Sequence, residues 1–403
     1  MASKMKKLKF IFRSLKHKNY KLFFGGQSVS LIGTWMQHIA MSWLVYRLTN
    51  SAFLLGMVGF LGQIPTFILT PFAGVLVDRY NKHRILMITQ VLAMLQAFVL
   101  AILVLTDNIL VWEIFALSMF LGLINAFDVP VRNAFTVEMI EKKEDLGNAI
   151  ALNSTMVTWA KLVGPTLAGF FIASFGEGIC FLINAVSYIA VIASLLAMNI
   201  SRKKIKISHQ HIFKELKDGF VYAFNFKPIK HILALLALVS LMGVPYQILL
   251  PIFAKDIFHG GPKTLGFLMA MAGIGASMGA MYLARRESIV GLYKIIAIAS
   301  GAFGFGIILF GLSKFLWLSM AIMCFIGFSM MVHVAASNTI LQTIVDENKR
   351  GRVMSFYTMA FMGMAPFGSL FAGSLAHKIG APNTFLITGV CCIIGAVWYF
   401  KKR

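Results

Sequence analysis

Two charged side chains stand within long apolar stretches of this chain, where an unpaired charge is costly. Lys161 lies in the stretch MVTWAKLVGPTLAG, and Asp128 lies in FLGLINAFDVPVRN. We expect Lys161 either to pair with Asp128 or to attract an anionic ligand, and proton binding at Asp128 would then release it. The other interpretation is that Lys161 extends toward the membrane surface while Asp128 pairs only with Arg132, one helical turn away.

Three further titratable side chains in or beside apolar stretches are candidates for ligand or proton coupling: His38, Glu113 and His333. The ordinary pKa of histidine, near 6.5, suits proton exchange, but a histidine between helices also serves as a hydrogen-bonded packing residue. Uncharged polar side chains could orient a polar ligand group or hydrogen-bond one helix to another. This set comprises Gln37, Gln63, Asn125, Tyr246, Gln247, Asn338 and Gln342.

The composition places these residues in a membrane. Apolar residues make up 59% of the 403 residues and charged residues 13%, whereas charged side chains are about a quarter of a soluble globular protein. Charge-poor runs of roughly 18 or more residues, long enough to cross a bilayer, begin near residues 22, 52, 85, 109, 150, 178, 232, 264, 295, 315, 353 and 382. Because backbone groups must be paired in lipid, each run should be a helix. We predict an all-α membrane protein with twelve transmembrane helices.

The second half of the chain repeats the first. Four glycines, Gly147, Gly164, Gly169 and Gly176, align in order with Gly351, Gly368, Gly373 and Gly380. Many secondary transporters consist of two such repeats around a site near the membrane midplane. We therefore predict four segments: a basic N-terminal segment at 1–20, a six-helix bundle at 21–200, a linker at 201–230 and a second six-helix bundle at 231–403.

The net charge of +22 follows the membrane topology. Most of the 37 Lys and Arg residues lie in the N-terminal tail, in the central linker and in the loops after the even-numbered apolar runs. Loops on the opposite side hold only Arg47, Lys255, Lys263, Lys314 and Lys378. By the positive-inside rule, both termini and the linker lie in the cytoplasm. The basic excess therefore predicts contact with anionic lipids and not with nucleic acid.

The linker has the pattern of a helix lying on the membrane. Apolar residues recur every four positions, at Ile212, Leu216, Phe220 and Phe224, which predicts an amphipathic helix on the cytoplasmic surface. His209 and His211 could hold a metal, but no third ligand lies nearby, so we predict neither a metal nor a cofactor. The first apolar run lacks a small-residue cleavage site and should remain attached.

A charged motif follows the second apolar run: Gly74-Val-Leu-Val-Asp78-Arg79-Tyr-Asn-Lys-His-Arg84. Gly74 would let a neighbouring helix approach closely. Asp78, at the cytoplasmic end of its helix, could accept hydrogen bonds from the N-terminus of another helix. Such a contact can form in one conformation and break in another. We therefore predict a conformational latch formed by Gly74, Asp78, Arg79 and Arg84.

This motif resembles the loop between the second and third helices of the major facilitator superfamily. The resemblance covers nearly the whole chain, and five further segments are similar to the branch of enterobactin-exporter-like and macrolide-efflux-like permeases. These are Gly33-Thr-Trp35-Met-Gln37, Trp43-Leu-Val-Tyr-Arg-Leu-Thr49, Asp128-Val-Pro130-Val-Arg132, Phe181-Leu-Ile-Asn184-Ala and Arg350-Gly351-Arg352-Val. The resemblance implies a fold of two pseudo-symmetric six-helix bundles in a bacterial cytoplasmic (inner) membrane, rocker-switch alternating access, and export of a bulky organic molecule, usually against protons.

Gly164-Pro165-Thr-Leu-Ala168-Gly169 resembles the antiporter motif of the same family. Small residues allow two helices to pack tightly, and a proline removes one helical hydrogen bond and kinks or softens the helix. We therefore predict a hinge at Gly164, Pro165 and Gly169 that seals one half against the other. In the second half, the segment from Gly279 to Arg286 lacks an aspartate at the matching place, so a latch there should be weaker.

These features favour a secondary transporter that exports an amphipathic organic molecule, such as a siderophore or a drug, by proton antiport and as a monomer. A lysophospholipid or other lipid transporter, and a facilitator without proton coupling, are the alternatives within transport. An intramembrane enzyme would need a convergent nucleophile, base or metal, and the sequence has no His-Glu zinc motif and no Gly-x-Ser-x-Gly. A receptor remains a further alternative, although the latch and hinge would then have no purpose.

Overall fold

The computed structural model describes residues 12–198, 226–286 and 288–402, and of residues 70–79 and 348 only the backbone. Every regular element within these residues is a helix. Eleven helical stretches among them are long and apolar enough to cross a membrane. The twelfth span is α2, which has 32 residues and a lower mean hydropathy than its neighbours. The predicted all-α protein with twelve transmembrane helices is confirmed.

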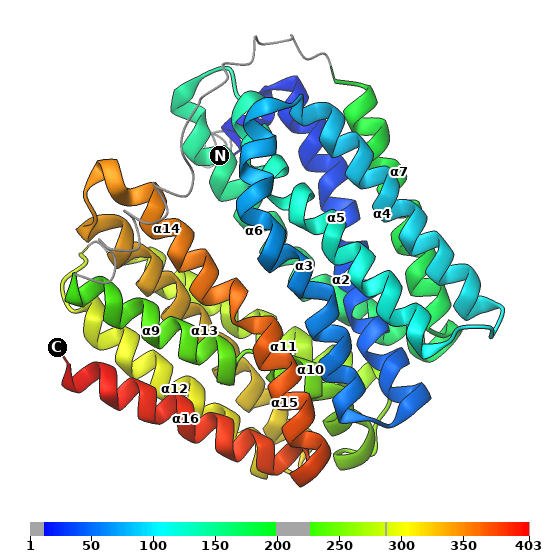
Figure 1. Cartoon of the computed structure of the whole chain (residues 1–403), viewed down its shortest axis with the longest axis vertical. Helices are drawn as coiled ribbons and strands as arrows, with labels where there is room; N and C mark the ends of the chain where they lie inside the picture. Colours follow the sequence, from blue (N-terminus) through cyan, green and yellow to red (C-terminus); the bar gives the residue numbers. More distant parts are fainter. Residues whose placement is uncertain (1–11, 199–225, 287, 403) are drawn as a thin grey trace, which may run out of the picture. The chain divides into compact units, whose positions relative to one another are not determined.

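Six spans precede the central linker and six follow it (Figure 1). The first six are α2 (Lys18–Thr49), α3 (Ala52–Arg79), α4 (Lys82–Leu105), α5 (Val111–Glu138), α6 (Lys143–Phe175) and α7 (Glu177–Leu196), preceded by the 3-10 helix η1 (Arg13–Lys16). Of the later six, four are single helices: α11 (Pro262–Ala284), α12 (Leu292–Leu312), α13 (Leu316–Ile344) and α16 (Ala381–Lys401). The 3-10 helix η3 (Glu347–Lys349) follows α13.

The two remaining spans contain π-helical segments. One consists of α9 (Lys227–Met242), α10 (Tyr246–Ile252) and η2 (Phe253–Ile257), and the other of α14 (Arg350–Thr358), η4 (Met359–Gly363) and α15 (Ala365–Ile379). A π-helical turn is rare and frequently marks a functional site. The hydroxyl of Ser240 on α9 donates a hydrogen bond to the carbonyl oxygen of Phe361 in η4, so the widened turn has a partner on a neighbouring helix.

The helix boundaries differ slightly from the predicted segments. Helix α2 begins at Lys18, inside the predicted N-terminal segment, and α9 begins at Lys227, inside the predicted linker. Pro228 lies at the start of α9, where its missing N–H has no helical partner to lose. The predicted amphipathic helix of the linker, together with His209 and His211, lies outside the described residues.

The internal repeat is visible in the backbone. Gly176, between α6 and α7, has a φ of 82°, and Gly380, between α15 and α16, has a φ of 83°. Residues with side chains rarely adopt these angles, so glycine allows the chain to turn directly from one span into the next. Gly164 on α6 packs against α2, and Gly368 on α15 packs against α9. In each half, therefore, the fifth span packs on the first through a glycine.

The described helices form two compact units. Unit 1 contains the described residues up to Met41 and those from Ile68 to the linker, and unit 2 contains residues 42–67 and the described residues after the linker. Helices α2 and α3 are thus each divided between the units. Residues 42–67 belong with the later spans because they pack on them directly: a Cβ on Gly56 would lie 2.5 Å from the carbonyl oxygen of Ser369 on α15. The predicted boundaries of the two six-helix bundles stay a prediction.

Unit 1 is organised around α4, which packs on α5 and α7. Its core near the start of α2 contains Phe23, Leu86 and Phe135, all fully or almost fully buried. The buried hydroxyl of Tyr20 donates to the carbonyl oxygen of Ala149 at 2.8 Å. This hydrogen bond joins the start of α2 to α6, so these two helices are fixed to each other at one end.

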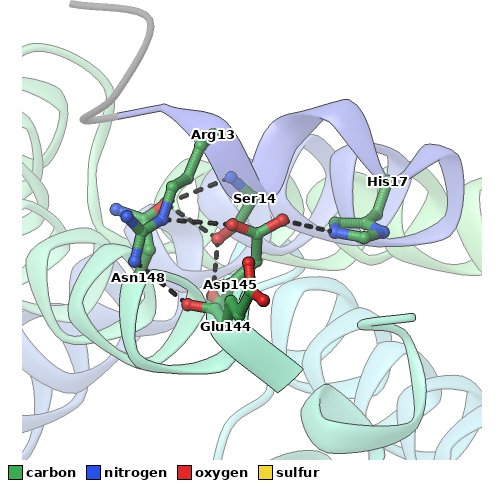
Figure 2. A network of polar contacts seen from close by, with 6 residues as sticks. All are labelled: Arg13, Ser14, His17, Glu144, Asp145 and Asn148. Carbon is green, nitrogen blue, oxygen red and sulfur yellow. Dashed lines mark hydrogen bonds and ion pairs between the residues drawn. The ribbon is translucent and has the colours of Figure 1, made fainter. Parts of the chain in front are cut away.

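A polar network fixes η1 to the first turn of α6 (Figure 2). The carboxylate of Asp145 lies 3.1 Å from Nε of Arg13 and 3.1 Å from Nε2 of His17. The side-chain oxygen of Asn148 accepts hydrogen bonds from the backbone N–H of Ser14 at 3.1 Å and from its hydroxyl at 2.7 Å. A carboxylate at the start of a helix also complements the helix dipole. The chain is therefore fixed by side chains immediately before it enters α2.

In unit 2, α11 and α13 cross at a pair of glycines. A Cβ on Gly275 would lie 1.8 Å from the carbonyl oxygen of Cys324, and a Cβ on Gly327 would lie 2.0 Å from that of Ala272. Helix α12 packs beside both α13 and α16 (Figure 1). Because backbone meets backbone at this crossing, even a methyl group on either glycine would force the two helices apart.

Candidate functional site

Lys161 lies near the middle of the 33-residue helix α6. Its ammonium group sits over the indole ring of Trp35 on α2, 5.1 Å from the ring centroid. The imidazole of His38, one turn further along α2, lies beside the same indole with 5.5 Å between the ring centroids. Lys161 and His38 are exposed, and Trp35 is partly exposed. These three residues form the Lys161 cluster.

The two helices of the Lys161 cluster approach closely because α6 carries a glycine at the crossing. A Cβ on Gly164 would lie 2.6 Å from Cβ of Trp35 and 3.0 Å from the carbonyl oxygen of Ile32. The predicted tight packing at Gly164 therefore occurs within unit 1, between α6 and α2. The hinge role of Gly164, Pro165 and Gly169, all of which are buried, stays a prediction.

The accessible surface of α6 is divided into a polar face and an apolar face. Ser154, Thr158 and Lys161 follow one another at helical spacing and are exposed or partly exposed. On a different face, Trp159 is 61% exposed and Phe170 is 54% exposed. An apolar face suits lipid, whereas an ammonium group in the middle of a span requires water or a polar partner. The face that carries Lys161 is therefore the one suited to an aqueous cavity.

A backbone acceptor lies in the same part of α6. Pro165 stands one helical turn after Lys161, inside a helix that continues through it. Proline has no N–H, so it cannot donate the usual hydrogen bond to the carbonyl oxygen four residues earlier. That oxygen belongs to Lys161. The site thus offers a cationic donor on the side chain and an acceptor on the backbone of one residue.

Asp128 on α5 is buried, with 4% of its surface exposed. Its Oδ1 accepts a hydrogen bond from Nε2 of Gln90 at 2.7 Å and lies 2.9 Å from the hydroxyl of Thr89, both on α4. Its Oδ2 lies 3.7 Å from Nε of Arg132, one turn along α5. Two arrangements of Asp128 are expected from the sequence, and the structure has the one in which Asp128 lies beside Arg132. Lys161 contacts Trp35 and not Asp128.

The carboxylate of Asp128 has one neighbour with spare hydrogen-bonding capacity. The side-chain oxygen of Gln90 is buried and has no hydrogen-bond partner among the described residues. A buried polar atom without a partner is costly, so its retention calls for a reason. The amide group of Gln90 can present either its N–H or its oxygen to Asp128 by rotating, which matches the two protonation states of a carboxyl group.

A chain of buried amides crosses unit 1. Nδ2 of Asn184 on α7 donates to the side-chain oxygen of Gln37 on α2 at 2.6 Å. Nε2 of Gln37 donates to the side-chain oxygen of Gln96 on α4 at 3.0 Å, and Nε2 of Gln96 donates to the carbonyl oxygen of Leu117 on α5 at 3.2 Å. Gln37, the residue predicted to orient a polar ligand group, is therefore engaged between helices inside unit 1.

Gln96, Gln90 and Thr89 are not among the residues predicted from the sequence. The available signal was the type of residue: two glutamines stand in the apolar stretch ITQVLAMLQAFV of α4. An amide inside a transmembrane helix needs a partner on a neighbouring helix. That reasoning predicts that such partners exist, but it cannot identify them, because they come from other helices.

His333 is a buried residue between two helices of unit 2. Its Nδ1 lies 2.8 Å from the hydroxyl oxygen of Ser300 on α12, and that hydroxyl lies 2.6 Å from the carbonyl oxygen of Ile296. Ser300 therefore donates to the backbone, and His333 donates to Ser300. This geometry corresponds to a hydrogen-bonded packing residue, and the proton-coupling role of His333 stays a prediction.

Two other candidates lie at helix ends or in partly exposed positions. Glu113 accepts a hydrogen bond from the backbone N–H of Leu110 at 2.9 Å and caps the start of α5. Asn338 on α13 is partly exposed, and its side-chain oxygen accepts a hydrogen bond from Nε2 of Gln342. The first contact is structural, whereas the second leaves an amide pair accessible in unit 2. Coupling roles for both residues stay predictions.

The predicted latch is only partly described. Gly74, Asp78 and Arg79 lie on α3 within the stretch for which the structure gives the backbone alone. Arg84 is exposed in the first turn of α4, and its backbone N–H donates to the side chain of Asn81, which caps that helix. The latch therefore stays a prediction.

Comparison with known proteins decides the family. The model of the transmembrane secretion effector family, a group of major facilitator transporters, matches residues 11–403. The chain belongs to the major facilitator superfamily. The family resemblance seen in the sequence is confirmed, and this major facilitator protein is a membrane transporter and not an enzyme.

The transporter is similar to several curated transport proteins. It is 28% identical to the staphyloferrin A transporter of Staphylococcus aureus, covering 95% of this chain and 96% of that protein. It is 25% identical to macrolide efflux protein A of Streptococcus pyogenes, covering 95% and 96%. It is 22% identical to an enterobactin exporter of Shigella boydii, covering 89% and 85%. Two of these three relatives are named for efflux or export.

Solved structures support the fold. The nucleoside transporter NupG has a TM-score of 0.73 at 12% identity, covering 96% of this chain and 99% of that one. A bacterial homologue of the human lysosomal transporter Spinster also has a TM-score of 0.73, at 13% identity, covering 95% and 97%. At these identities the likeness concerns the fold alone, which is that of a major facilitator transporter.

Proposed function

We propose that this transporter exports an amphipathic organic molecule by alternating access and that proton antiport drives the export. The names of its relatives, for staphyloferrin A, macrolides and enterobactin, support a bulky organic substrate such as a siderophore or a drug. The abundance of methionine and phenylalanine, with 24 and 36 residues, suits a cavity for such molecules.

The observation that best supports proton coupling is the burial of Asp128 within a span. Other carboxylates whose side chains the structure describes lie near helix ends or in loops, such as Glu113 at the start of α5 and Asp145 at the start of α6. An acidic residue inside a membrane protein marks a proton or ion pathway by default. Protonation would remove the negative charge that faces Arg132, so the ion pair would be lost in one step of the cycle.

Gln90 provides a way for α4 to respond to that protonation. In the ionised state Asp128 only accepts hydrogen bonds, and Gln90 donates to it at 2.7 Å. A protonated carboxyl group has an O–H to donate, and the unpartnered oxygen of Gln90 could accept it after rotation of the amide. The contact between α4 and α5 would then change with the proton, without any change in the residues involved.

Alternating access requires contacts that form on one side of the membrane and break in each cycle. Candidates lie within unit 2, where the end of α2 meets η2. Tyr46 donates a hydrogen bond to Asp256, and Nζ of Lys255 donates to the side chain of Asn50 at 2.6 Å. We propose that these contacts close the outer side and open for release of the substrate. Both contacts join polar side chains, and water can replace such hydrogen bonds when they break, which supports this role.

The orientation and surroundings follow from charge. Basic residues gather at the N-terminal tail, the central linker and the loops of the same side, which supports cytoplasmic termini in a bacterial inner membrane and contact with anionic lipids. We propose that the transporter acts as a monomer, because each helical half can enclose its share of the substrate path.

The test is flux in proteoliposomes with and without an imposed pH gradient, using siderophores, dyes and lysolipids in parallel. We expect export of a siderophore or dye to depend on the gradient. Asp128→Asn should abolish the gradient dependence and retain exchange of substrate across the membrane without a gradient. Asp107→Asn is the matched control, because Asp107 is an exposed loop residue with a φ of 54°, a conformation that asparagine tolerates.

Each alternative gives a different result. Flux that ignores the pH gradient in the unmodified protein would remove the antiport and leave a facilitator. Movement of lysolipids alone would favour the lipid transporter. If no compound moves under any gradient, the proposed export of these compound classes is refuted, and the receptor interpretation returns.

A further inference from the structure

The accessible charge in the middle of unit 1 is positive. Lys161 is exposed near the middle of α6. Asp128, the carboxylate that could compensate it, is 4% exposed and already faces Arg132 at 3.7 Å. Among the described residues, no carboxylate forms an ion pair with Lys161. A ligand that reaches this face therefore meets a cation whose charge is not cancelled by a neighbouring acid.

Trp35 occupies the position where a counter-ion would be expected. A cation over an indole face gains about 0.5 to 2 kcal/mol, depending on desolvation. A charge-assisted hydrogen bond to an anion is stronger than a neutral contact and adds directional donation from the ammonium group. Trp35 can therefore hold Lys161 in place in the absence of an anion without preventing an anion from binding.

The surroundings of the ammonium group are those of a site for an amphipathic molecule. The indole of Trp35 and the imidazole of His38 lie beside each other, with 5.5 Å between ring centroids. The hydroxyls of Ser154 and Thr158 extend the polar face along α6, each bonded to its own helix at 3.0 Å and 2.9 Å. Flat rings offer apolar contact to the body of a ligand, and the ammonium group offers its charge.

We propose that Lys161, Trp35 and His38 form a subsite for an anionic group, a carboxylate or a comparable oxyanion, carried on an apolar or aromatic body. The proposal rests on the transport function proposed above and names its substrate class. It separates anionic amphiphiles from the cationic ones, because a cationic ligand would place its charge next to that of Lys161, and like charges repel each other. The carbonyl oxygen of Lys161, which Pro165 cannot engage, can accept an N–H or O–H next to the anionic group.

Three dansyl compounds test this with one fluorophore and three charges: dansylglycine (anionic), dansylamide (neutral) and dansylcadaverine (cationic). Binding is measured as energy transfer from tryptophan to dansyl in the full-length protein in phosphatidylcholine nanodiscs. We expect dansylglycine to bind most tightly. Lys161→Gln should weaken its binding by about tenfold or more, the effect expected for loss of a charge-assisted hydrogen bond, and Lys161→Arg should restore most of it.

Two controls separate the site from general effects. Lys314→Gln removes one positive charge from an exposed residue in the loop between α12 and α13 and should leave the binding of all three compounds unchanged. Trp35→Phe keeps an aromatic ring with a weaker cation-binding face. It should preserve the order anion, neutral, cation while it lowers the energy transfer, because one donor is lost.

An anionic lipid headgroup offers the same oxyanion chemistry as a dissolved ligand. Repeating the titration in nanodiscs that contain phosphatidylglycerol separates the two sources. Unchanged affinity for dansylglycine supports a subsite for the transported molecule. Strong competition by phosphatidylglycerol that disappears in Lys161→Gln would assign Lys161 to a lipid phosphate and overturn the substrate assignment.

The remaining outcomes distinguish this inference from the proposed transport. Equal binding of dansylglycine by the unmodified protein and Lys161→Gln would overturn the subsite, as would preferred binding of dansylcadaverine. If the protein transports dansylcadaverine but not dansylglycine, export stands and the substrate class is wrong. If dansylglycine binds in a Lys161-dependent way while no compound is transported, the subsite stands and the transport function fails.

Discussion

Tyr46 near the end of α2 donates a hydrogen bond to the carboxylate of Asp256 in η2, 210 residues further along the chain. Nζ of Lys255 lies over the ring of the same tyrosine, 5.4 Å from its centroid, and donates to Asn50. The side chain of Tyr46 thus contacts both Lys255 and Asp256, a basic and an acidic residue that are adjacent in the sequence. This arrangement fixes the end of the first span to the end of the seventh within unit 2.

Tyr46→Phe removes the hydrogen bond to Asp256 and retains the ring. Because Asp256 is exposed, we expect a cost of about 1 kcal/mol, below the range of about 1.5 to 3 kcal/mol for a bond to a charged group, and roughly fivefold faster local opening. Hydrogen exchange of the backbone amides around Asn50 and Asp256 measures this. Tyr282→Phe, which changes a 41% exposed tyrosine of α11, is the control and should leave those amides unchanged. Unaltered exchange in Tyr46→Phe would mean that the contact does not hold the two ends together.

Gly164→Ala tests the crossing of α2 and α6. The new methyl group would meet Cβ of Trp35 at 2.6 Å and the carbonyl oxygen of Ile32 at 3.0 Å, so the helices must move apart. We expect a loss of about 1 to 3 kcal/mol, as for overpacked cores, seen as a lower midpoint of thermal unfolding in detergent.

Gly147→Ala on the same helix is the matched control for this change. A Cβ on Gly147 meets nothing within 4 Å, and alanine favours a helix over glycine by up to about 1 kcal/mol. Gly147→Ala should therefore leave the unfolding midpoint unchanged or raise it. Equal effects of the two substitutions would contradict the close crossing.

Gln37→Leu tests the chain of buried amides. It leaves Nδ2 of Asn184 and the side-chain oxygen of Gln96 without the contacts that Gln37 provides, at about 1 to 3 kcal/mol for each buried group. We expect a marked fall in the midpoint of thermal unfolding. Gln63→Leu should have little effect, because among the described residues Gln63 donates only to the carbonyl oxygen of Gly59 on its own helix. A stable Gln37→Leu protein would show that leucine packing replaces the network.

Asn148→Ala tests the attachment of η1 to α6 (Figure 2). It removes the acceptor for both the backbone N–H and the hydroxyl of Ser14, which is fully buried. The loss of about 1 to 2 kcal/mol should raise the rate of tryptic cleavage after Arg13 and Lys16 by roughly tenfold. Asn383→Ala, at an exposed position whose amide donates only a local hydrogen bond to the carbonyl oxygen of Ile379 at the end of α15, should leave cleavage unchanged. Cleavage that does not accelerate in Asn148→Ala would assign the attachment to Asp145 alone.

Much of the fold could be predicted from the sequence. Twelve apolar runs predict twelve helices, because lipid offers no partner to an unpaired backbone group. Aligned glycines predict a repeat, and Gly176 and Gly380 do adopt nearly equal φ angles of 82° and 83°. Helix α2 is the instructive exception in hydropathy, because its buried Gln27, Ser30 and Gln37 lower the average of the span.

The sequence by itself determined that Lys161 and Asp128 stand inside spans, because their positions along apolar runs fix their depth. Only the tertiary structure decided that the ammonium group of Lys161 lies over the ring of Trp35 and that Asp128 accepts hydrogen bonds from Gln90 and Thr89. Depth is a property of one helix, which spacing reveals. A partner is a property of two helices, and it depends on their rotation and on glycines such as Gly164 that set how closely they approach.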